Sequence, residues 1–199
     1  MIRIYLFVAF IAGLLVSECF AQTKTFVNYP SKTILPIVFR GAEGVESHGS
    51  CTIIDKTIAL TAGHVVGGSV AEIKSTEVVR GKVIAIDLFH DRALVRLEKP
   101  IECVPRKLRT EPLKENEPVW AFGYGRGFGH TLGRAVAKGL LGRSTPGDSG
   151  GPILDQAGQV VGIVQGFSSS GDLYGHGRST LIEWIQRNKD NDPIDLGGN

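Results

Sequence analysis

Several features are scarce or missing in this sequence, and each scarcity argues against a class of protein. The uncharged run Ile4–Val16 near the N-terminus, which polar Ser17 follows, has 13 residues, whereas a membrane-spanning helix needs about 20 apolar residues. There is no tract of basic residues, and the formal net charge is only +2, so nothing indicates nucleic acid as a partner. Few segments have helical periodicity and no internal repeat is found, which argues against a helical or repeat protein.

The N-terminus has the features of a secretory signal peptide. Arg3 is the single cation before the run Ile4–Val16, and the following segment Ser17–Ala21 ends in a small residue. This order is typical of a leader that is cleaved after Ala21. We therefore expect a secreted or periplasmic protein with no stable membrane insertion after cleavage. Lipid attachment at Cys19 is disfavoured, because such sites require a small residue where this chain has charged Glu18.

Removal of the leader would leave two of the three cysteines, Cys51 and Cys103. In an oxidising compartment they can form a disulfide. On a chain-entropy estimate, closing this loop of about 50 residues would add roughly 3–5 kcal/mol of stability. Two separate buried thiols that behave as small hydrophobic side chains are an equally good alternative.

Short apolar segments recur along the chain with turn residues between them, a spacing typical of an all-β barrel or sandwich. The predicted strands are Ile34–Phe39, Thr52–Ile54, Thr57–Thr61, Val78–Ile86, Ala93–Leu97, Val119–Phe122, Arg134–Ala137 and Val160–Val164. One helix is predicted over Thr180–Arg187, where Leu181, Trp184 and Ile185 fall at i, i+3 and i+4. The fold class that follows is all-β with a helix near the C-terminus.

The stretch Lys99–Pro118 is rich in proline and in charged residues and shows neither helical nor strand periodicity. It is interpreted as a connector between two β halves. We predict a signal peptide at 1–21, an N-terminal half at 22–105 and a C-terminal half at 106–188 that includes the helix. The polar residues 189–199 end in glycines and are predicted to form a flexible tail.

The segment Thr145–Pro152 reads Thr-Pro-Gly-Asp-Ser-Gly-Gly-Pro and surrounds Ser149 with glycines. Glycines allow a tight turn that projects the hydroxyl group and exposes backbone amides. A serine hydroxyl is a weak nucleophile, so a base must take its proton and a third group must orient that base. The sequence should therefore also contain a histidine and a carboxylate.

Both candidates are present. His64 lies in Ala-Gly-His-Val after the apolar segment Ile58–Thr61, and Asp91 lies in His-Asp-Arg-Ala-Leu-Val just before a predicted strand. Asp87 is the rival carboxylate, but no Ala-Leu-Val segment follows it directly. His64, His90 and Asp91 also raise the question of zinc, yet their spacing matches no ligand pair, so no metal or other cofactor is expected.

In their order along the chain, the histidine, aspartate and serine windows resemble the triad blocks of the chymotrypsin-like (trypsin-like) serine protease family. The segment Trp120–Gly125 is similar to the strand that opens the second barrel of that family, and Val161–Val164 to the strand that lines its substrate cleft. The resemblance covers about residues 34–186. A short second half places the chain nearer to compact bacterial members.

The resemblance implies two six-stranded antiparallel Greek-key barrels with a C-terminal helix and an active site in the cleft between them. It implies that His64 takes the proton of Ser149 during attack on a peptide carbonyl, while Asp91 orients His64. The N–H groups of Gly147 and Ser149 would form the oxyanion hole. The expected activity is that of a secreted serine endopeptidase that acts on peptides or proteins through an acyl-enzyme, without a cofactor and as a monomer.

The same resemblance places the substrate-binding residues at Arg143, Ser144, Gln165, Gly166 and Phe167. An extended substrate would pair with the backbone at 165–167 like an added strand. Arg143 stands where the trypsin branch has an acidic residue, so cleavage after Lys or Arg is not expected. Either Arg143 admits an acidic substrate residue, or it turns outward or pairs with a carboxylate. Phe167 would narrow the pocket toward small side chains.

Two departures from the family pattern leave questions open. No Ile-Val-Gly-Gly segment is present to form an activating terminus, so Asp148 needs another partner or the protein needs no such activation. Val65 replaces the cysteine that often follows the catalytic histidine. Two alternative functions stay open: an inactive or latent protease-fold binding module, and an esterase-like hydrolase with the same triad.

Overall fold

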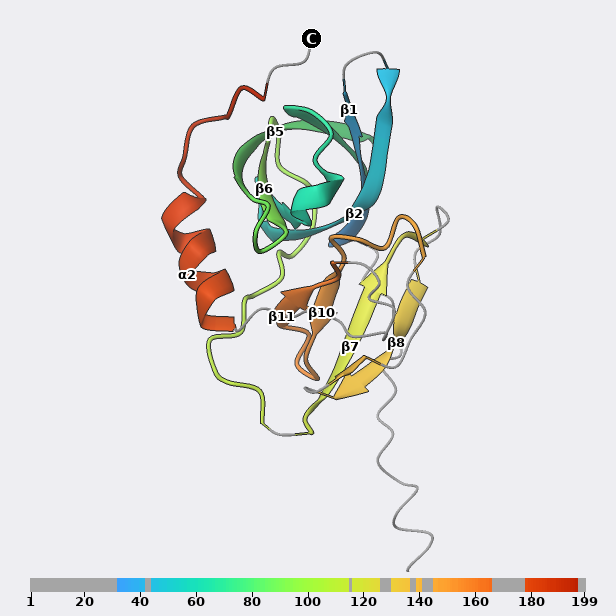
Figure 1. Ribbon diagram of the computed structural model, residues 1–199, viewed down its shortest axis with the longest axis vertical. Helices are drawn as coiled ribbons and strands as arrows, with labels where there is room; N and C mark the ends of the chain where they lie inside the picture. Colours follow the sequence, from blue (N-terminus) through green and yellow to red (C-terminus); the bar gives the residue numbers. More distant parts are fainter. Residues whose placement is uncertain are drawn as a thin grey trace, which may run out of the picture.

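The computed structural model describes residues 32–41, 44–114, 116–125, 130–136, 139–140, 145–165 and 178–196. Its strands are β1 (Ile34–Arg40), β2 (Glu46–Asp55), β3 (Ile58–Thr61), β4 (Val70–Lys74), β5 (Val78–Asp87), β6 (Arg92–Leu97), β7 (Pro118–Gly123), β8 (His130–Val136), β9 (Gly139–Leu140), β10 (Pro152–Leu154) and β11 (Val160–Ile163). The single-turn 3-10 helix η2 (Gly63–Val65) and the helix α2 (Arg178–Asn188) complete these elements. Figure 1 shows a barrel beside a sheet, with α2 along one side.

The first six strands form a closed barrel in the order β1-β2-β3-β6-β5-β4, and every neighbouring pair is antiparallel. β1 closes the barrel because it pairs with two partners, with Ile37 opposite both Gly49 of β2 and Ile73 of β4. Closure leaves no exposed strand edge that could pair with another chain. The prediction of an all-β fold with a six-stranded barrel in the first half is confirmed.

The second half is a five-stranded antiparallel sheet with the order β11-β10-β7-β8-β9. A second closed barrel, which the family resemblance implied, is not seen in the described part of the chain. The sheet ends at β11 on one side and at the two-residue β9 on the other. The intervening segments 126–129, 141–144 and 166–177 lie outside the described residues. Within the same described ranges, no helix has the length and apolarity needed to cross a membrane.

Three strands were missed by the sequence analysis, β4, β9 and β10, and all are short; β9 has only two residues. β4 has only Ala71 and Ile73 buried, with Glu72 between them and Lys74 at its end, so its apolar alternation is weak. β10 has three residues and follows the glycine-rich segment directly, which hides it from a search for strand-length apolar runs.

Two large hydrophobic clusters give the molecule its rigidity. One fills the barrel and includes the fully buried Phe39, Ile53 and Ile73. The other combines Leu60 and Leu94 of the barrel with sheet and helix residues that include Phe122, Leu154 and Trp184. Because this second cluster takes side chains from both halves and from α2, it holds the loops of the two halves in a fixed relation.

Thr52 is the one residue of the described part whose buried side-chain polar atom has no hydrogen-bond partner. It lies on β2 and is completely buried. Valine has nearly the same shape and removes the unpaired hydroxyl, so Thr52→Val is expected to raise the free energy of unfolding by about 1 kcal/mol. Urea denaturation followed by circular dichroism measures this difference.

Thr61→Val is the matched control, because Thr61 is equally buried but donates its hydroxyl to Ser50 O at 2.8 Å. This variant is expected to lose about 1–3 kcal/mol, since it leaves a buried carbonyl without its donor. Equal losses in the two variants would contradict the assignment of Thr52 as an unpaired group.

Candidate active site

His64 is presented by a short turn between the barrel strand β3 and the loop that leads to β4. The neighbours Gly63 and Val65 are buried in η2, whereas the His64 side chain is 49% exposed. The apolar strand β3 and the buried Val65 therefore fix the backbone on both sides of an imidazole that remains accessible to a second reactant.

Asp91 lies in the turn between β5 and β6 and accepts hydrogen bonds from His64. The His64 backbone N–H donates to Asp91 Oδ1 at 2.8 Å, and His64 Nδ1 lies 2.9 Å from both Asp91 Oδ1 and Asp91 Oδ2. Asp91 adopts a left-handed backbone conformation with φ of 49°, which aspartate tolerates better than most residues. A carboxylate at Nδ1 selects the tautomer with Nδ1 protonated and leaves Nε2 as the proton acceptor.

The electrostatics of this pair favour a charged imidazole. The hydrogen bond with Asp91 raises the pKa of His64, and the Asp91 charge adds to this, although partial burial opposes it. Burial also raises the pKa of the Asp91 carboxyl, but the hydrogen bonds from His64 outweigh it and leave this pKa below the ordinary value. The Asp91 carboxylate therefore stabilises the imidazolium that forms when His64 takes up a proton.

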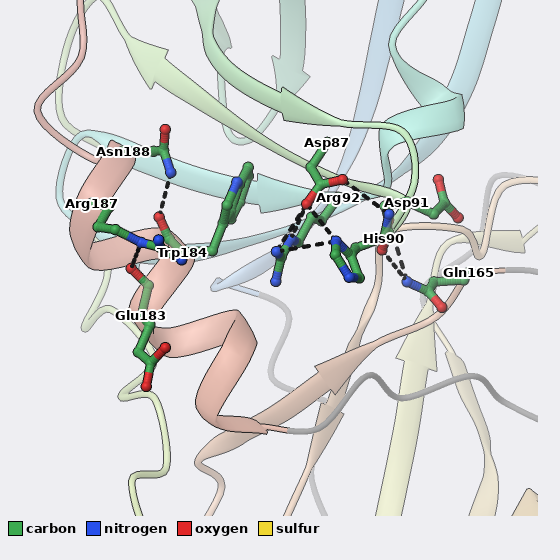
Figure 2. A network of polar contacts seen from close by, with 9 residues as sticks. All are labelled: Asp87, His90, Asp91, Arg92, Gln165, Glu183, Trp184, Arg187 and Asn188. Carbon is green, nitrogen blue, oxygen red and sulfur yellow. Dashed lines mark hydrogen bonds and ion pairs between the residues drawn. The ribbon is translucent and has the colours of Figure 1, made fainter.

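Asp87, the rival carboxylate, lies in a separate network that supports the Asp91 turn (Figure 2). Its carboxylate contacts His90 Nδ1 at 2.7 Å and Arg92 Nη2 at 2.9 Å, and it accepts the His90 backbone N–H at 3.0 Å. Burial opposes ionisation, but these contacts together lower the pKa of Asp87 to about 2. The guanidinium of the buried Arg92 lies 4.6 Å from the ring centroid of Trp184, which connects the network to α2.

Ser149 lies in the glycine-rich loop between β8–β9 and β10, and this loop contacts the barrel. The Ser149 carbonyl accepts the Ser50 backbone N–H at 2.7 Å. Gly150 has φ of 85°, and a Cβ there would lie 2.2 Å from Ser50 O, so only glycine fits. Ser149 Oγ and His64 Nε2 share no hydrogen bond in the described part of the chain. Catalytic hydrogen bonds are often long in the absence of substrate.

The backbone amides of the loop fall into two groups. The N–H groups of Asp148, Gly150 and Gly151 donate to carbonyls of Thr145, Val164 and Asp148 respectively. By contrast, the N–H groups of Gly147 and Ser149 have no acceptor within the described residues. These two amides are therefore available to an external anion, and they are the two that the sequence analysis expected to form an oxyanion hole.

The Asp148 carboxylate, for which the sequence analysis found no partner, is buried and accepts several hydrogen bonds. The Gly125 N–H donates to Oδ1 at 2.6 Å, and Thr145 donates to Oδ2 from its backbone N–H at 2.6 Å and from its hydroxyl at 3.0 Å. These three donors lie in the same half of the chain as Ser149.

Among the expected substrate-binding residues, only Gln165 is described, and its side chain has another role. Gln165 Nε2 donates to His90 O at 2.6 Å and is 3.5 Å from Asp91 O, so it ties the end of β11 to the Asp91 turn (Figure 2). The other four, Arg143, Ser144, Gly166 and Phe167, lie outside the described residues.

The structure has Cys51 and Cys103 as free cysteines and therefore does not contain the disulfide that the sequence left open. Cys51 is fully buried in the barrel cluster, against which Cys103 packs, and burial raises the pKa of the Cys51 thiol. Such a thiol is inert toward most reagents. No group of three metal-ligating side chains is found in the described ranges.

Sequence reasoning missed three residues that build this region: Ser50, Arg92 and the side chain of Gln165. Their partners are 97, 5 and 75 positions away. The contact of Arg92 with Asp87 could have been predicted from the sequence, because the two residues are only five positions apart, on either side of the turn between β5 and β6. The contacts of Ser50 and Gln165 could not, since they depend on how the two halves pack.

Comparison with known proteins places the chain in a family. A family model described as the trypsin-like peptidase domain matches residues 49–163, so the chain belongs to the trypsin-like peptidase domain family. This confirms the resemblance seen in the triad windows.

Curated relatives and a solved structure resemble this chain in sequence and in fold, respectively. The chain is 31% identical over 168 residues to a "Probable periplasmic serine endoprotease DegP-like" of Pseudomonas putida, covering 74% of this chain and 35% of that protein. It is 30% identical to the "Putative serine protease HhoB" of Synechocystis, covering 66% of this chain and 36% of the relative. The chain thus spans about a third of the length of these curated relatives. Its fold matches the active form of the Rv3671c protease of M. tuberculosis with a TM-score of 0.72 at 20% identity, covering 85% and 86% of the two chains.

Proposed function

We propose that this chain is a serine endopeptidase in which His64, Asp91 and Ser149 form the catalytic triad. The observation that carries the proposal is the pairing of Asp91 with both Nδ1 and the backbone N–H of His64. That pairing leaves Nε2 as the one ring nitrogen able to accept a proton. Membership of the peptidase family supports the same assignment, as do the N–H groups of Gly147 and Ser149, which have no acceptor in the part of the chain that the structure describes.

In the proposed mechanism, His64 Nε2 takes the proton of Ser149 as its Oγ attacks the substrate carbonyl carbon. The carbonyl oxygen becomes an oxyanion, which accepts hydrogen bonds from the N–H groups of Gly147 and Ser149. His64 then returns the proton to the leaving amine, and an acyl-enzyme remains. Water releases the acyl group in a second round with the same proton acceptor.

The oxyanion loop requires no activating cleavage in this proposal. In family members that need one, a new N-terminal amine pairs with the aspartate before the nucleophile. Here the corresponding Asp148 carboxylate accepts its hydrogen bonds from Gly125 and Thr145. The enzyme is therefore proposed to be active once its leader is removed, in the periplasm or outside the cell, where the Pseudomonas relatives are described as periplasmic.

The experiment that tests the function is export of the full chain from a Gram-negative host, with Ser149→Ala as the control. The exported protein is expected to begin at Gln22 by intact mass, to react with a fluorophosphonate probe at Ser149, and to cut members of a diverse peptide library. The cut sites, read by mass spectrometry, give the preferred substrate side chain and show whether Arg143 selects acidic residues.

Three results would contradict parts of the proposal. Turnover of simple esters without peptide cleavage would favour the esterase-like hydrolase. A folded protein that neither reacts with the probe nor cuts peptides would favour a binding module or a latent protease. A mass that includes residues 1–21 would contradict removal of the leader.

A further inference from the structure

Ser50 is a buried residue of the barrel that contacts the loop of Gly147 and Ser149 in the other half of the chain. It lies on β2, has no exposed surface and belongs to no predicted motif. Its hydroxyl donates to Gly147 O at 2.7 Å and accepts the Tyr124 backbone N–H at 2.8 Å. Its backbone N–H donates to Ser149 O at 2.7 Å.

The two carbonyls that Ser50 binds belong to Gly147 and Ser149, whose N–H groups have no acceptor among the described residues. Ser50 Oγ holds the carbonyl of Gly147 and Ser50 N–H holds that of Ser149. In each case a single pair of backbone torsions, φ and ψ of one residue, separates the bound carbonyl from the free amide. The direction of each amide is therefore set by a group that is anchored on the barrel.

The Ser50 hydroxyl matters most at Gly147, because a glycine backbone restricts its own φ and ψ angles very little. Gly147 has φ of 102°, and a glycine has a wider range of alternative conformations than any other residue. Without an external donor, the peptide after Gly147 can rotate and the amide before it can turn away. The Ser50 hydroxyl both donates and accepts a hydrogen bond here, so its own orientation is defined.

Ser50 also connects this loop to the turn that carries His64. The Thr61 hydroxyl donates to Ser50 O at 2.8 Å, and Thr61 ends β3 three positions before His64. One residue thus contacts the loop of Gly147 and Ser149 through two groups and the end of β3 through a third.

We propose that Ser50 is a positioning residue, which holds the amides of Gly147 and Ser149 in the direction that binds the oxyanion. The proposal rests on the proposed peptidase function. Ser50 is not proposed to contact the substrate. It is a barrel residue that helps to orient two N–H donors of the other half of the chain.

The first test compares Ser50→Ala with the parent on a peptide that the parent cleaves. Removal of one oxyanion donor typically costs 10²–10³-fold in kcat, and a donor that is present but misdirected should cost about 10–100-fold. KM is expected to change by less than about threefold, because the ground-state carbonyl uses the hole only weakly. The matched control is Thr52→Val, a buried hydroxyl on the same strand without a partner in the described part, which should leave kcat unchanged.

A second readout separates positioning from a general structural role. A peptide boronate that forms a tetrahedral adduct with Ser149 places an oxygen in the oxyanion position, so its affinity should fall by the same factor as kcat/KM. A non-covalent peptide of the same sequence that ends in a carboxamide has no negatively charged oxygen at that position and should bind Ser50→Ala and the parent equally well.

The isosteric variants Ser50→Thr and Ser50→Val test whether the hydroxyl is required for activity, even if Ser50→Ala does not fold. Both add one methyl-sized group, but only threonine retains the hydroxyl, so threonine should keep at least tenfold more kcat than valine. A kcat within twofold of the parent in Ser50→Ala, or equal kcat in the Thr and Val variants, would overturn the Ser50 proposal. Failure of the parent itself to cleave peptides would instead overturn the proposed function.

Discussion

Replacement of Ser149 by alanine is expected to lower kcat for a cleaved peptide by about 10⁶-fold, and His64→Ala should lower it by a similar factor. The double variant should lose no more than either single one, because a nucleophile without its base and a base without its nucleophile are equally ineffective. Single-turnover kinetics on one peptide of the library, with enzyme in excess, measures all three variants.

This non-additivity matters here because the two side chains share no hydrogen bond in the described part of the chain. If they act as a unit in the substrate complex, the losses overlap; if they act independently, the double variant loses the product of the two factors. His48→Ala is a suitable control, since the His48 side chain lies at the surface, where its Nε2 is 3.2 Å from Glu46 Oε2. It should retain the parental rate.

Replacement of Asp91 by asparagine is expected to lower kcat by about 10⁴-fold. The Asp91 carboxylate accepts from both Nδ1 and the backbone N–H of His64, and an amide that turns its NH₂ group toward the imidazole stabilises the wrong tautomer. The imidazolium formed during the reaction would also lose its neighbouring negative charge. Steady-state kinetics at saturating peptide measures the loss.

The pH dependence of kcat/KM gives an independent test of the same pair. Only neutral His64 can accept a proton, so kcat/KM should fall as the pH decreases through the pKa of His64, which the hydrogen bond with Asp91 raises above 6.5. In Asp91→Asn this acidic limb should move to lower pH, because the cause of the raised pKa has been removed. Asp87→Asn is the comparison: it weakens the support of the Asp91 turn, should cost less than Asp91→Asn, and should leave the limb in place. An unmoved limb in Asp91→Asn would contradict the assignment of Asp91 as the partner of His64.

The buried Asp148 carboxylate is hydrogen-bonded within the half of the chain that carries Ser149. The carboxylate accepts hydrogen bonds from Gly125 and Thr145, both of which lie in the same half as Ser149. This arrangement is why the proposed function includes no activating cleavage. The loop is then held on one side by Asp148 and on the other by Ser50.

Much of the fold could be predicted because its signals are local. Alternating and continuous apolar segments such as Ile34–Phe39 and Ala93–Leu97 predicted strands that the structure contains as β1 and β6. β4 escaped detection because its pattern is short and interrupted by charge. The extent of the second sheet was overestimated, since the resemblance implied a closed barrel and the described residues form five strands.

The candidate catalytic residues could be named from sequence because each stands in a distinctive neighbourhood. Glycines flank Ser149, a small-residue turn precedes His64, and a strand follows Asp91. Their neighbours could not be named in the same way. Nothing near Ser50 in the chain indicates that its hydroxyl binds Gly147, because that contact joins residues 97 positions apart.

The amino-acid sequence by itself determined the all-β class, the membership of the trypsin-like family and the identity of the candidate triad. These follow from periodicity and short motifs, which are properties of neighbouring residues. Only the tertiary structure decided that Asp91 contacts both Nδ1 and the backbone N–H of His64, and that Gln165 binds the backbone of His90. It also decided that Ser50 binds the carbonyls of Gly147 and Ser149. Such contacts arise when a shared hydrophobic core fixes two halves against each other, and their partners depend on strand register and packing rather than on order along the chain.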